Sequence, residues 1–206
     1  MEREIGAEKR RLRERIRRRA DGMTEEAATE SSRKIEAELL ASRIWRDAES
    51  VFLYVSVGKE PDMRGLIKQA LLEGKRVYVP KCLPGPERTM LAVRIRSMEE
   101  LLPGTLGIPE PVFDPDDPPE TAAAAEVDLI LAPCVTANRR GERLGHGAGY
   151  YDRYLAPLAS PNREEKTAVL CLCHEALLTE EIPADGNDIR ADAVVTGDGS
   201  ALQKFF

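Results

Sequence analysis

The chain has 206 residues, of which 42% are hydrophobic and 32% charged, a composition typical of a globular protein with a substantial core. It contains no apolar run near the ~20 residues that span a bilayer, so the sequence indicates no membrane segment. The net charge is −6, although residues 1–20 hold nine Lys/Arg and only four Glu. An acidic body with one basic arm disfavours broad nucleic-acid binding, which needs a continuous positive surface.

The basic arm is expected to form a helix over residues 9–19. Leu12 and Ile16, four residues apart, make a narrow apolar stripe along it. Lys9 and Arg13 are also four apart, so they share one helical face and can reach a single anion together. A solvated basic face is the alternative interpretation. No apolar core follows the arm, which argues against a signal peptide, and we therefore expect a cytoplasmic protein.

A second helix is expected over residues 24–40, with Thr24 as its cap. The apolar run over residues 50–57 then predicts a buried parallel strand, followed by a short loop with Glu60 and a helix that Asp62 caps. Ligands of open α/β sheets bind at the carboxyl ends of the strands. This position makes Glu60 a candidate site residue, with an ordinary loop carboxylate as the alternative.

Further strands alternate with helices downstream, which predicts an α/β fold. We expect a mostly parallel twisted sheet flanked by helices on both faces, a three-layer sandwich, with residues 1–206 in one domain. The strand at residues 90–95 alternates in hydrophobicity and is expected to pair antiparallel at the sheet edge. The other expected strands cover residues 76–80, 127–133, 166–173 and 193–196, and residues 103–120 are expected to form a long ordered loop.

The cysteines are too few for a disulfide framework and lie in apolar, strand-like runs. They are Cys82, Cys134, Cys171 and Cys173. With only two histidines in the chain, a zinc site is not indicated. We expect buried free thiols in a reducing compartment.

The most informative stretch spans residues 139–155 and reads RRGERLGHGAGYYDRYL. Three glycines fall at every second position, which lets the backbone adopt positive φ and lets its N–H groups face an anion. A helix is expected to follow over residues 149–158, because apolar and aromatic residues recur there at helical spacing. The three glycines are Gly145, Gly147 and Gly149.

Charged side chains flank these glycines on both sides. Arg139, Arg140 and Arg143 place cations before them, and Asp152 offers an oxygen ligand for a metal after them. Together these parts suit a polyphosphate with its Mg²⁺. A glycine-rich turn between strand and helix, without any ligand, is the alternative.

This stretch resembles the signature of the 5-formyltetrahydrofolate cyclo-ligase (5,10-methenyltetrahydrofolate synthetase) family. The family pattern runs approximately D-hydrophobic-P and then RRG-x-RLG-x-G-x-GYYDR. Two departures stand out: Thr136-Ala137-Asn138 replaces the common Ala-Phe-Asp, and Ala148 replaces a frequent Lys or Gly. The positions in register are Asp128, Pro133, Arg139, Arg140, Gly141, Arg143, Leu144, Gly145, Gly147, Gly149, Tyr150, Tyr151, Asp152 and Arg153.

The resemblance implies binding roles along much of the chain and assigns no catalytic residue. It implies that Asp188 is a magnesium ligand, which Asp152 would complement, and that Val55 and Glu60 contact the folate. Tyr150 and Tyr151 are expected to position the folate, with packing of one of them under the loop as the alternative. It also implies that Lys9 and Arg13 contact ATP. The other expected ATP contacts belong to the glycine-rich stretch and are Arg143, Leu144, Gly145, His146, Gly147, Ala148, Gly149, Tyr150 and Tyr151.

The implied reaction is the ATP- and Mg²⁺-dependent conversion of 5-formyltetrahydrofolate to 5,10-methenyltetrahydrofolate, with release of ADP and phosphate. The formyl oxygen is a poor leaving group, so phosphoryl transfer to it would allow N10 to close the ring and phosphate to depart. The expected partners are ATP and a reduced folate, with no nucleic acid and no membrane, and the expected assembly is a monomer. Two alternatives stay open: a related ATP-dependent enzyme with another N-formyl substrate, and a nucleic-acid-binding protein that uses the basic N-terminal helix.

Overall fold

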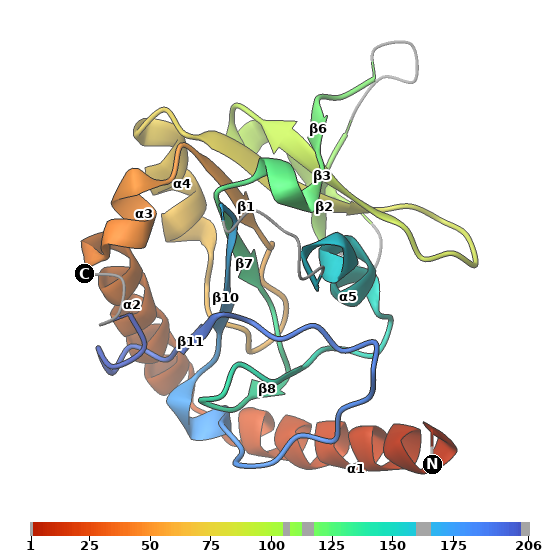
Figure 1. Ribbon diagram of the computed structural model, residues 1–206. Helices are drawn as coiled ribbons and strands as arrows, with labels where there is room; N and C mark the ends of the chain where they lie inside the picture. The colour runs from red at the N-terminus through yellow and green to blue at the C-terminus, as the bar shows by residue number, and fades with distance from the viewer. Residues whose placement is uncertain (1, 105–107, 113–117, 160–165, 203–206) are drawn as a thin grey trace.

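A seven-stranded sheet forms the centre of the computed structural model, which describes residues 2–104, 108–112, 118–159 and 166–202 (Figure 1). The strand order is β11-β10-β7-β1-β2-β3-β6. The first five pair in parallel and the last two join antiparallel, which confirms the expected mostly parallel sheet. The strands are β1 (Ser50–Leu53), β2 (Arg76–Cys82), β3 (Met90–Ile95), β6 (Thr121–Ala122), β7 (Leu129–Ala132), β10 (Ala168–Leu172) and β11 (Ala193–Val195).

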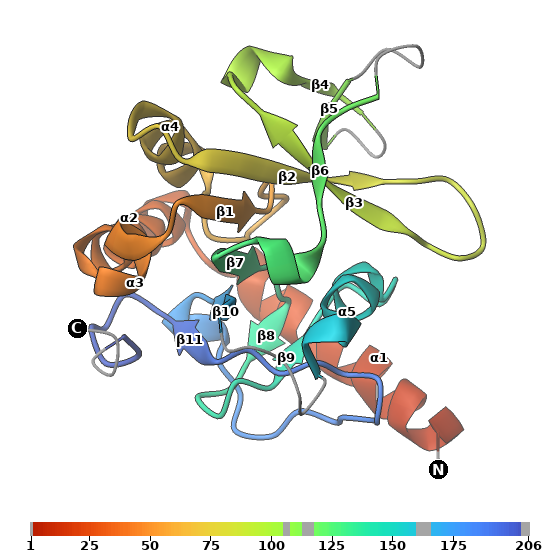
Figure 2. The same cartoon turned by 45° about the horizontal axis from the view of Figure 1, so that its top comes forward.

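Successive side chains along the central strands enter two different cores, because neighbouring residues of a strand point to opposite faces. In β1, Phe52 joins the core with Leu12 and Ile16, whereas Val51 and Leu53 join the other core. Helices on both faces therefore bury both sides of the sheet, as the sequence predicts (Figures 1 and 2). One core takes side chains from α1 (Glu2–Asp21) and α5 (Tyr150–Leu155), the other from α2 (Glu25–Ala41), α3 (Arg43–Asp47) and α4 (Arg64–Leu72).

Helix starts agree with the sequence only in part. Thr24 caps α2 as expected, since its hydroxyl accepts a hydrogen bond of 3.1 Å from Ala27 N. The expected cap of α4 by Asp62 is wrong: the N-cap is Met63, which makes no side-chain cap bond. Asp62 instead accepts from Arg64 N at 2.9 Å, two residues along, as Asp does in a local turn.

The strand expected over residues 50–57 ends early, at Leu53. The hydroxyls of Tyr54 and Ser56 both donate to Pro61 O, which turns this segment back on itself instead of extending the strand. Helix α5 is also shorter than expected, because the chain tightens to a 3₁₀ turn at Ala156–Ala159 where Pro157 lacks an N–H group.

The loop expected over residues 103–120 contains short strands. β4 (Leu101–Pro103) pairs antiparallel with β5 (Pro109–Pro111), while residues 105–107 and 113–117 lie outside the described residues. A second small sheet pairs β8 (Thr136–Ala137) with β9 (Arg143–Leu144), directly before the glycine-rich stretch. Other 3₁₀ turns among the described residues are Met98–Glu100, Ala124–Glu126 and Glu175–Leu177. None of the helices in the described ranges is long and apolar enough to cross a membrane.

Candidate active site

A cavity of about 1160 Å³ lies where β1 and β7 end, between α1, α5 and the segment around residue 188. It gathers side chains from widely separated parts of the chain, and every site residue that the sequence predicted lines it. Those residues are Lys9, Arg13, Val55, Glu60, Arg143, Leu144, Gly145, His146, Gly147, Ala148, Gly149, Tyr150, Tyr151, Asp152 and Asp188.

The glycine loop, residues 145–149, forms one wall of this cavity. Gly147 has φ 106° and Gly149 has φ 75°, both in the left-handed region that favours glycine. Within the described residues, none of the five main-chain N–H groups of this loop donates a hydrogen bond. The loop is exposed or only partly buried, so these amides are open to a molecule in the cavity. They form a ready cradle for an anion.

Arg13 supports the loop from α1. Its Nε donates to Gly145 O at 2.7 Å, and a Cβ added at Gly147 would lie 3.3 Å from the Arg13 guanidinium carbon. A side chain at position 147 would therefore crowd the arginine. Burial lowers the pKa of Arg13, with Arg17 adding to that effect, yet a guanidinium keeps its charge at neutral pH.

Lys9 lies deeper, between two carboxylates. Its Nζ is 2.7 Å from Asp185 Oδ2 and 2.6 Å from Asp188 Oδ2, and its side chain is only 11% exposed. Burial alone would lower the pKa of Lys9, but its bonds to Asp185 and Asp188 outweigh that and raise it. Lys9 in turn lowers the pKa of Asp185. The solvated-face alternative is therefore wrong for Lys9 and Arg13.

Asp152 reaches the same region from α5. Its Oδ1 accepts from Arg143 Nη2 at 2.7 Å and from Ile189 N at 3.3 Å, so Asp152 adjoins the segment that carries Asp188. Among the described residues, no group of three or more His, Cys, Asp or Glu is arranged to hold a metal. Asp152 and Asp188 nevertheless line the same cavity, and Mg²⁺ commonly takes one or two carboxylates together with water and phosphate oxygens.

Glu60 and His146 close the cavity on another side. Glu60 Oε1 lies 2.7 Å from His146 Nε2, and its Oε2 accepts from Val57 N at 2.9 Å. The Glu60 side chain is 6% exposed, so the loop after β1 presents a buried carboxylate and ties it to the glycine loop. In this structure His146 contacts Glu60.

Tyr151 packs beneath the loop and keeps one polar group free. Its ring stacks on Phe52 at 5.8 Å, and the Arg143 guanidinium lies 6.0 Å from the ring centre. The Tyr151 hydroxyl and Arg143 Nε are buried without a hydrogen-bond partner among the described residues. Burial raises the pKa of Tyr151 well above its ordinary value, so its hydroxyl remains a donor. Both atoms are available to a bound molecule.

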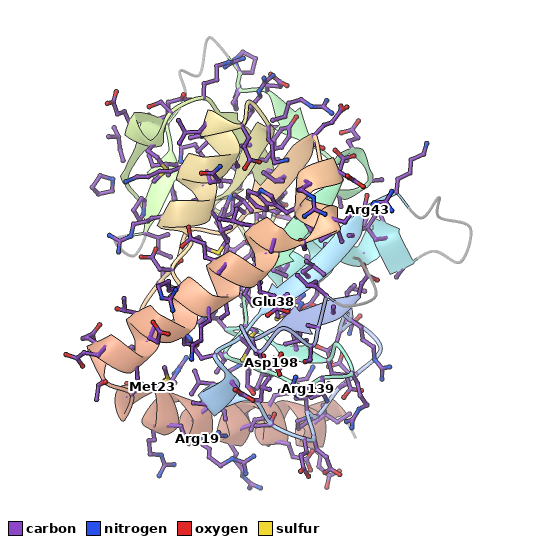
Figure 3. The ribbon with its side chains drawn as sticks, turned by 90° about the vertical axis from the view of Figure 1, so that its left-hand side faces the viewer. Arg19, Met23, Glu38, Arg43, Arg139 and Asp198 are labelled. Carbon is purple, nitrogen blue, oxygen red and sulfur yellow. The ribbon has the colours of Figure 1, made fainter. Side chains whose placement is uncertain are left out.

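Of the three arginines that the sequence places before the glycines, only Arg143 lines the cavity. Arg139 instead lies 2.8 Å from Asp198 at the surface (Figure 3), and Arg140 lies 3.0 Å from Glu142. The β8–β9 turn, in which Gly141 has φ 86°, directs them away from the cavity.

Asn138, one of the departures from the family pattern, holds this turn together. Its Oδ1 accepts from Arg140 N at 3.0 Å and Glu142 N at 3.2 Å, while its Nδ2 donates to Glu180 O at 3.2 Å. Asn138 Nδ2 also donates to the Glu142 carboxylate, so a neutral amide at position 138 anchors the turn where the family commonly has Asp.

Further charged groups line the cavity without having been predicted as site residues, and two of them are carboxylates. Asp185 is one; its only signal is the acidic, glycine-containing turn that it shares with Asp188. Glu110 from β5 is the other, a buried carboxylate that lies 2.7 Å from Lys81 Nζ. Nothing local in the sequence around Glu110 indicates that it reaches this site.

These features define a class: an α/β protein with a cavity at the carboxyl ends of parallel strands, walled by a glycine loop and lined by buried cations. The model of the 5-formyltetrahydrofolate cyclo-ligase family matches residues 5–197, and the chain belongs to this family. It is therefore an enzyme, a ligase of folate metabolism.

Named relatives agree with this assignment. The chain is 30% identical to the 5-formyltetrahydrofolate cyclo-ligase of Escherichia coli K12, over 88% of this chain and 96% of that protein. It is 34% identical to the 5-formyltetrahydrofolate cyclo-ligase of Mycolicibacterium smegmatis, over 81% and 84% of the two chains. The structure is similar to that of Aquifex aeolicus 5,10-methenyltetrahydrofolate synthetase, with a TM-score of 0.76, 29% identity, and coverage of 92% and 90%.

Proposed function

We propose that the protein converts 5-formyltetrahydrofolate to 5,10-methenyltetrahydrofolate and couples this to cleavage of ATP into ADP and phosphate. The observation that carries the proposal is the set of N–H groups at residues 145–149 that have no partner among the described residues, in a cavity that also holds Lys9, Arg13 and Arg143. The cavity volume of about 1160 Å³ exceeds the roughly 300–1,000 Å³ of most single-ligand sites, and so suits two substrates side by side.

The triphosphate is proposed to lie along the glycine loop. The amides of residues 145–149 would hold its oxygens, and Arg13 would keep the loop in shape through Gly145 O. Lys9 and Arg143 would exchange their present carboxylate partners for phosphate oxygens, which keeps both charges neutralised. Asp152 and Asp188 would then be free to hold Mg²⁺, which when bound neutralises charge that develops on the transferred phosphoryl group.

The reduced folate is proposed to occupy the part of the cavity near Glu60. A buried carboxylate can accept two hydrogen bonds from the amino group and ring N–H of a pterin. Glu60 is buried and already held by Val57 N, so its orientation is fixed before the substrate arrives. Val55 lines the same wall, and the unpartnered Tyr151 hydroxyl offers a further donor beside Tyr150.

In the proposed reaction the γ-phosphoryl group passes from ATP to the oxygen of the N5-formyl group. N10 then attacks the formyl carbon and loses its proton, the carbon–oxygen bond breaks, and phosphate leaves with that oxygen. The protein would act by positioning the two substrates and by stabilising charge, so no residue becomes covalently modified.

The proposed setting is the cytoplasm, and this rests on the cysteines. All four are free thiols, three of them buried, as is usual for proteins of a reducing compartment.

The test is the absorbance of the methenyl product with 5-formyltetrahydrofolate as substrate. We expect product only when ATP and Mg²⁺ are both present, with one ADP released for each ring closed. Product formed equally without ATP would contradict the coupling. Turnover of ATP with other N-formyl compounds but not with this folate would assign the cavity to a different substrate.

A further inference from the structure

The hairpin that joins β2 to β3 reaches the glycine loop from the far side of the cavity. It projects from the sheet on the side where α5 lies (Figures 1 and 2). Cys82 and Met90, at its base, line the cavity wall. Near its tip, Arg88 Nη1 donates to Ala148 O at 3.2 Å, a contact between residues 60 positions apart in the chain.

Arg88 occupies an unusual backbone conformation. Its φ is 51°, and it is the only non-glycine residue with positive φ among those that the structure describes. Hydrogen bonds from Leu83 N to Thr89 O and from Arg88 N to Gly85 O close the turn around it. Left-handed backbone in a residue with a side chain is strained, persists where its surroundings hold it, and is common at functional sites.

Ala148 O receives a second arginine as well. Arg153 Nη1, from α5, donates to it at 3.0 Å. Two guanidinium groups therefore converge on one neutral carbonyl, and Arg13 holds the carbonyl of Gly145 in the same loop. The arginines thus bind two carbonyl groups of the loop, those of Gly145 and Ala148. The N–H groups of residues 145–149 have no partner in the described part of the chain. Such a division between carbonyls and amides is what an anion cradle requires.

We infer that Arg88 is a positioning residue for the nucleotide: by holding Ala148 O, it keeps the glycine loop in its anion-binding shape. The inference rests on the proposed ATP site and assigns to it a residue from the β2–β3 hairpin. Arg88 touches the loop and no reacting atom, so its effect is on binding of the phosphates. Its charge adds to that of Arg153 beside the loop and strengthens the attraction for a polyanion.

Two substitutions at Arg88 separate the effect of losing the guanidinium group from the effect of backbone strain. Arg88→Ala removes the side chain and leaves a residue with a Cβ at positive φ, whereas Arg88→Gly removes the same side chain and relieves the strain. The matched control is Arg96→Ala, which removes an exposed arginine that follows β3 and lies 3.5 Å from Glu120. All three variants lose one positive charge.

Steady-state kinetics with both substrates provide the test. We expect the KM for ATP to rise about fivefold in both Arg88 variants, while kcat and the KM for the folate stay within about twofold. Arg96→Ala should leave all three values at those of the wild type. A hairpin that merely loses its shape would also raise the folate KM, because Cys82 and Met90 line the shared cavity.

Each other outcome has a definite meaning. A normal KM for ATP in Arg88→Gly, with a raised one only in Arg88→Ala, would overturn the inference, because backbone strain alone would then explain the effect. Wild-type KM values in both variants would overturn the inference as well. In either case the proposed function would stand as long as the wild type shows ATP-dependent turnover. Absence of ATP-dependent turnover in the wild type would overturn both.

Discussion

Two of the buried cations at the site, Lys9 and Arg143, are each paired with carboxylates. Lys9 lies between Asp185 and Asp188, and Arg143 pairs with Asp152, with side-chain exposures of only 11% for Lys9 and 3% for Arg143. Removing one partner from such a half-buried pair leaves the other charge poorly solvated. In the proposed complex, a triphosphate with its metal ion would supply phosphate oxygens to Lys9 and Arg143 and a cation to Asp152 and Asp188.

Lys9 offers the first residue-scale prediction. Lys9→Ala should raise the KM for ATP at least about tenfold, because it removes a charged hydrogen bond to the phosphates, and should change the folate KM by less than about twofold. Arg11→Ala is the matched control, since Arg11 lies on the same helix, is exposed, and loses the same charge. Initial rates over a matrix of the two substrate concentrations decide the question. Equal changes in both KM values would indicate a structural role for Lys9.

The second prediction concerns Asp152. In Asp152→Asn the amide oxygen can still accept from Arg143 and Ile189 N, so the fold should persist, while Mg²⁺-dependent turnover should fall about 100-fold. Asp47→Asn, which alters an exposed aspartate paired with Arg43, should have no effect. The measurements are kcat over a Mg²⁺ titration and a thermal melt of each variant. An unchanged kcat would remove Asp152 from the metal site.

Whether a site residue can be predicted from the sequence depends on how far apart in the chain the residues of each contact lie. The glycine loop and Asp152 are local to one motif, and Lys9 with Arg13 follow from helical spacing plus the family resemblance. Asp185 joins Lys9 across 176 positions, and no local pattern encodes that distance. Arg88 was missed for the same reason. Sequence proximity also does not reveal the direction of the β8–β9 turn, which points Arg139 and Arg140 away from the cavity although they precede the glycine loop.

Among the elements, the β8–β9 turn is the one that delivers the glycine loop. Gly141 lies within it at φ 86° and receives a hydrogen bond from Ala191 N at 2.9 Å. A Cβ at this position would lie 2.1 Å from Ala191 O, far inside contact distance. The turn and the segment before β11 are therefore in direct backbone contact, which only glycine permits.

Gly141→Ala should accordingly destabilise the fold. Left-handed φ costs an alanine about 1 kcal/mol, and the backbone clash should bring the total to at least about 3 kcal/mol. Gly74→Ala is the matched control, because Gly74 also has positive φ, 74°, but a Cβ there meets nothing within 4 Å. Urea denaturation of both variants isolates the clash as the difference between them. Equal losses of stability would show that the backbone at Ala191 moves aside.

The element boundaries show where local reasoning fails. Periodicity located α2 and the central strands, since both faces of those strands are buried and apolar. It extended β1 too far because it cannot see that Tyr54 and Ser56 both bond to Pro61 O. The pairing of β4 with β5 was missed because prolines lie in both strands and sequence patterns assign proline to loops.

For the whole molecule, the sheet with its two cores brings distant segments to one end, where the site lies. α1 lies beside the end of the sheet toward which β7 and β10 run, and its Leu12 and Ile16 anchor it in one core (Figure 1). This burial fixes the adjoining strip of the helix, with Lys9 and Arg13, at the cavity. The N-terminal basic helix thus serves the site as part of the fold, rather than as a separate arm.

His174 links the layers on the other side and makes stability depend on pH. It lies at the end of β10, 1% exposed, with Nδ1 2.8 Å from Ser31 Oγ of α2. Burial lowers the pKa of His174 below the usual value of about 6.5, so the folded protein favours the neutral ring. Between the lowered folded pKa and about pH 6.5, the unfolded chain therefore binds more protons than the folded protein. The contribution of His174 is complete above about pH 6.5 and is lost as the pH falls toward and through the lowered folded value.

The free energy of unfolding should thus decrease between about pH 7.5 and pH 5.5, and part of this decrease should vanish in His174→Gln. Gln keeps polar atoms for Ser31 but cannot take up a proton in that range. His146→Gln is the matched control, because it removes the other histidine, whose side chain is 48% exposed. Urea denaturation at the two pH values measures all three proteins. A pH dependence as steep in His174→Gln as in the wild type would show that carboxylates alone cause it, since they are common to both.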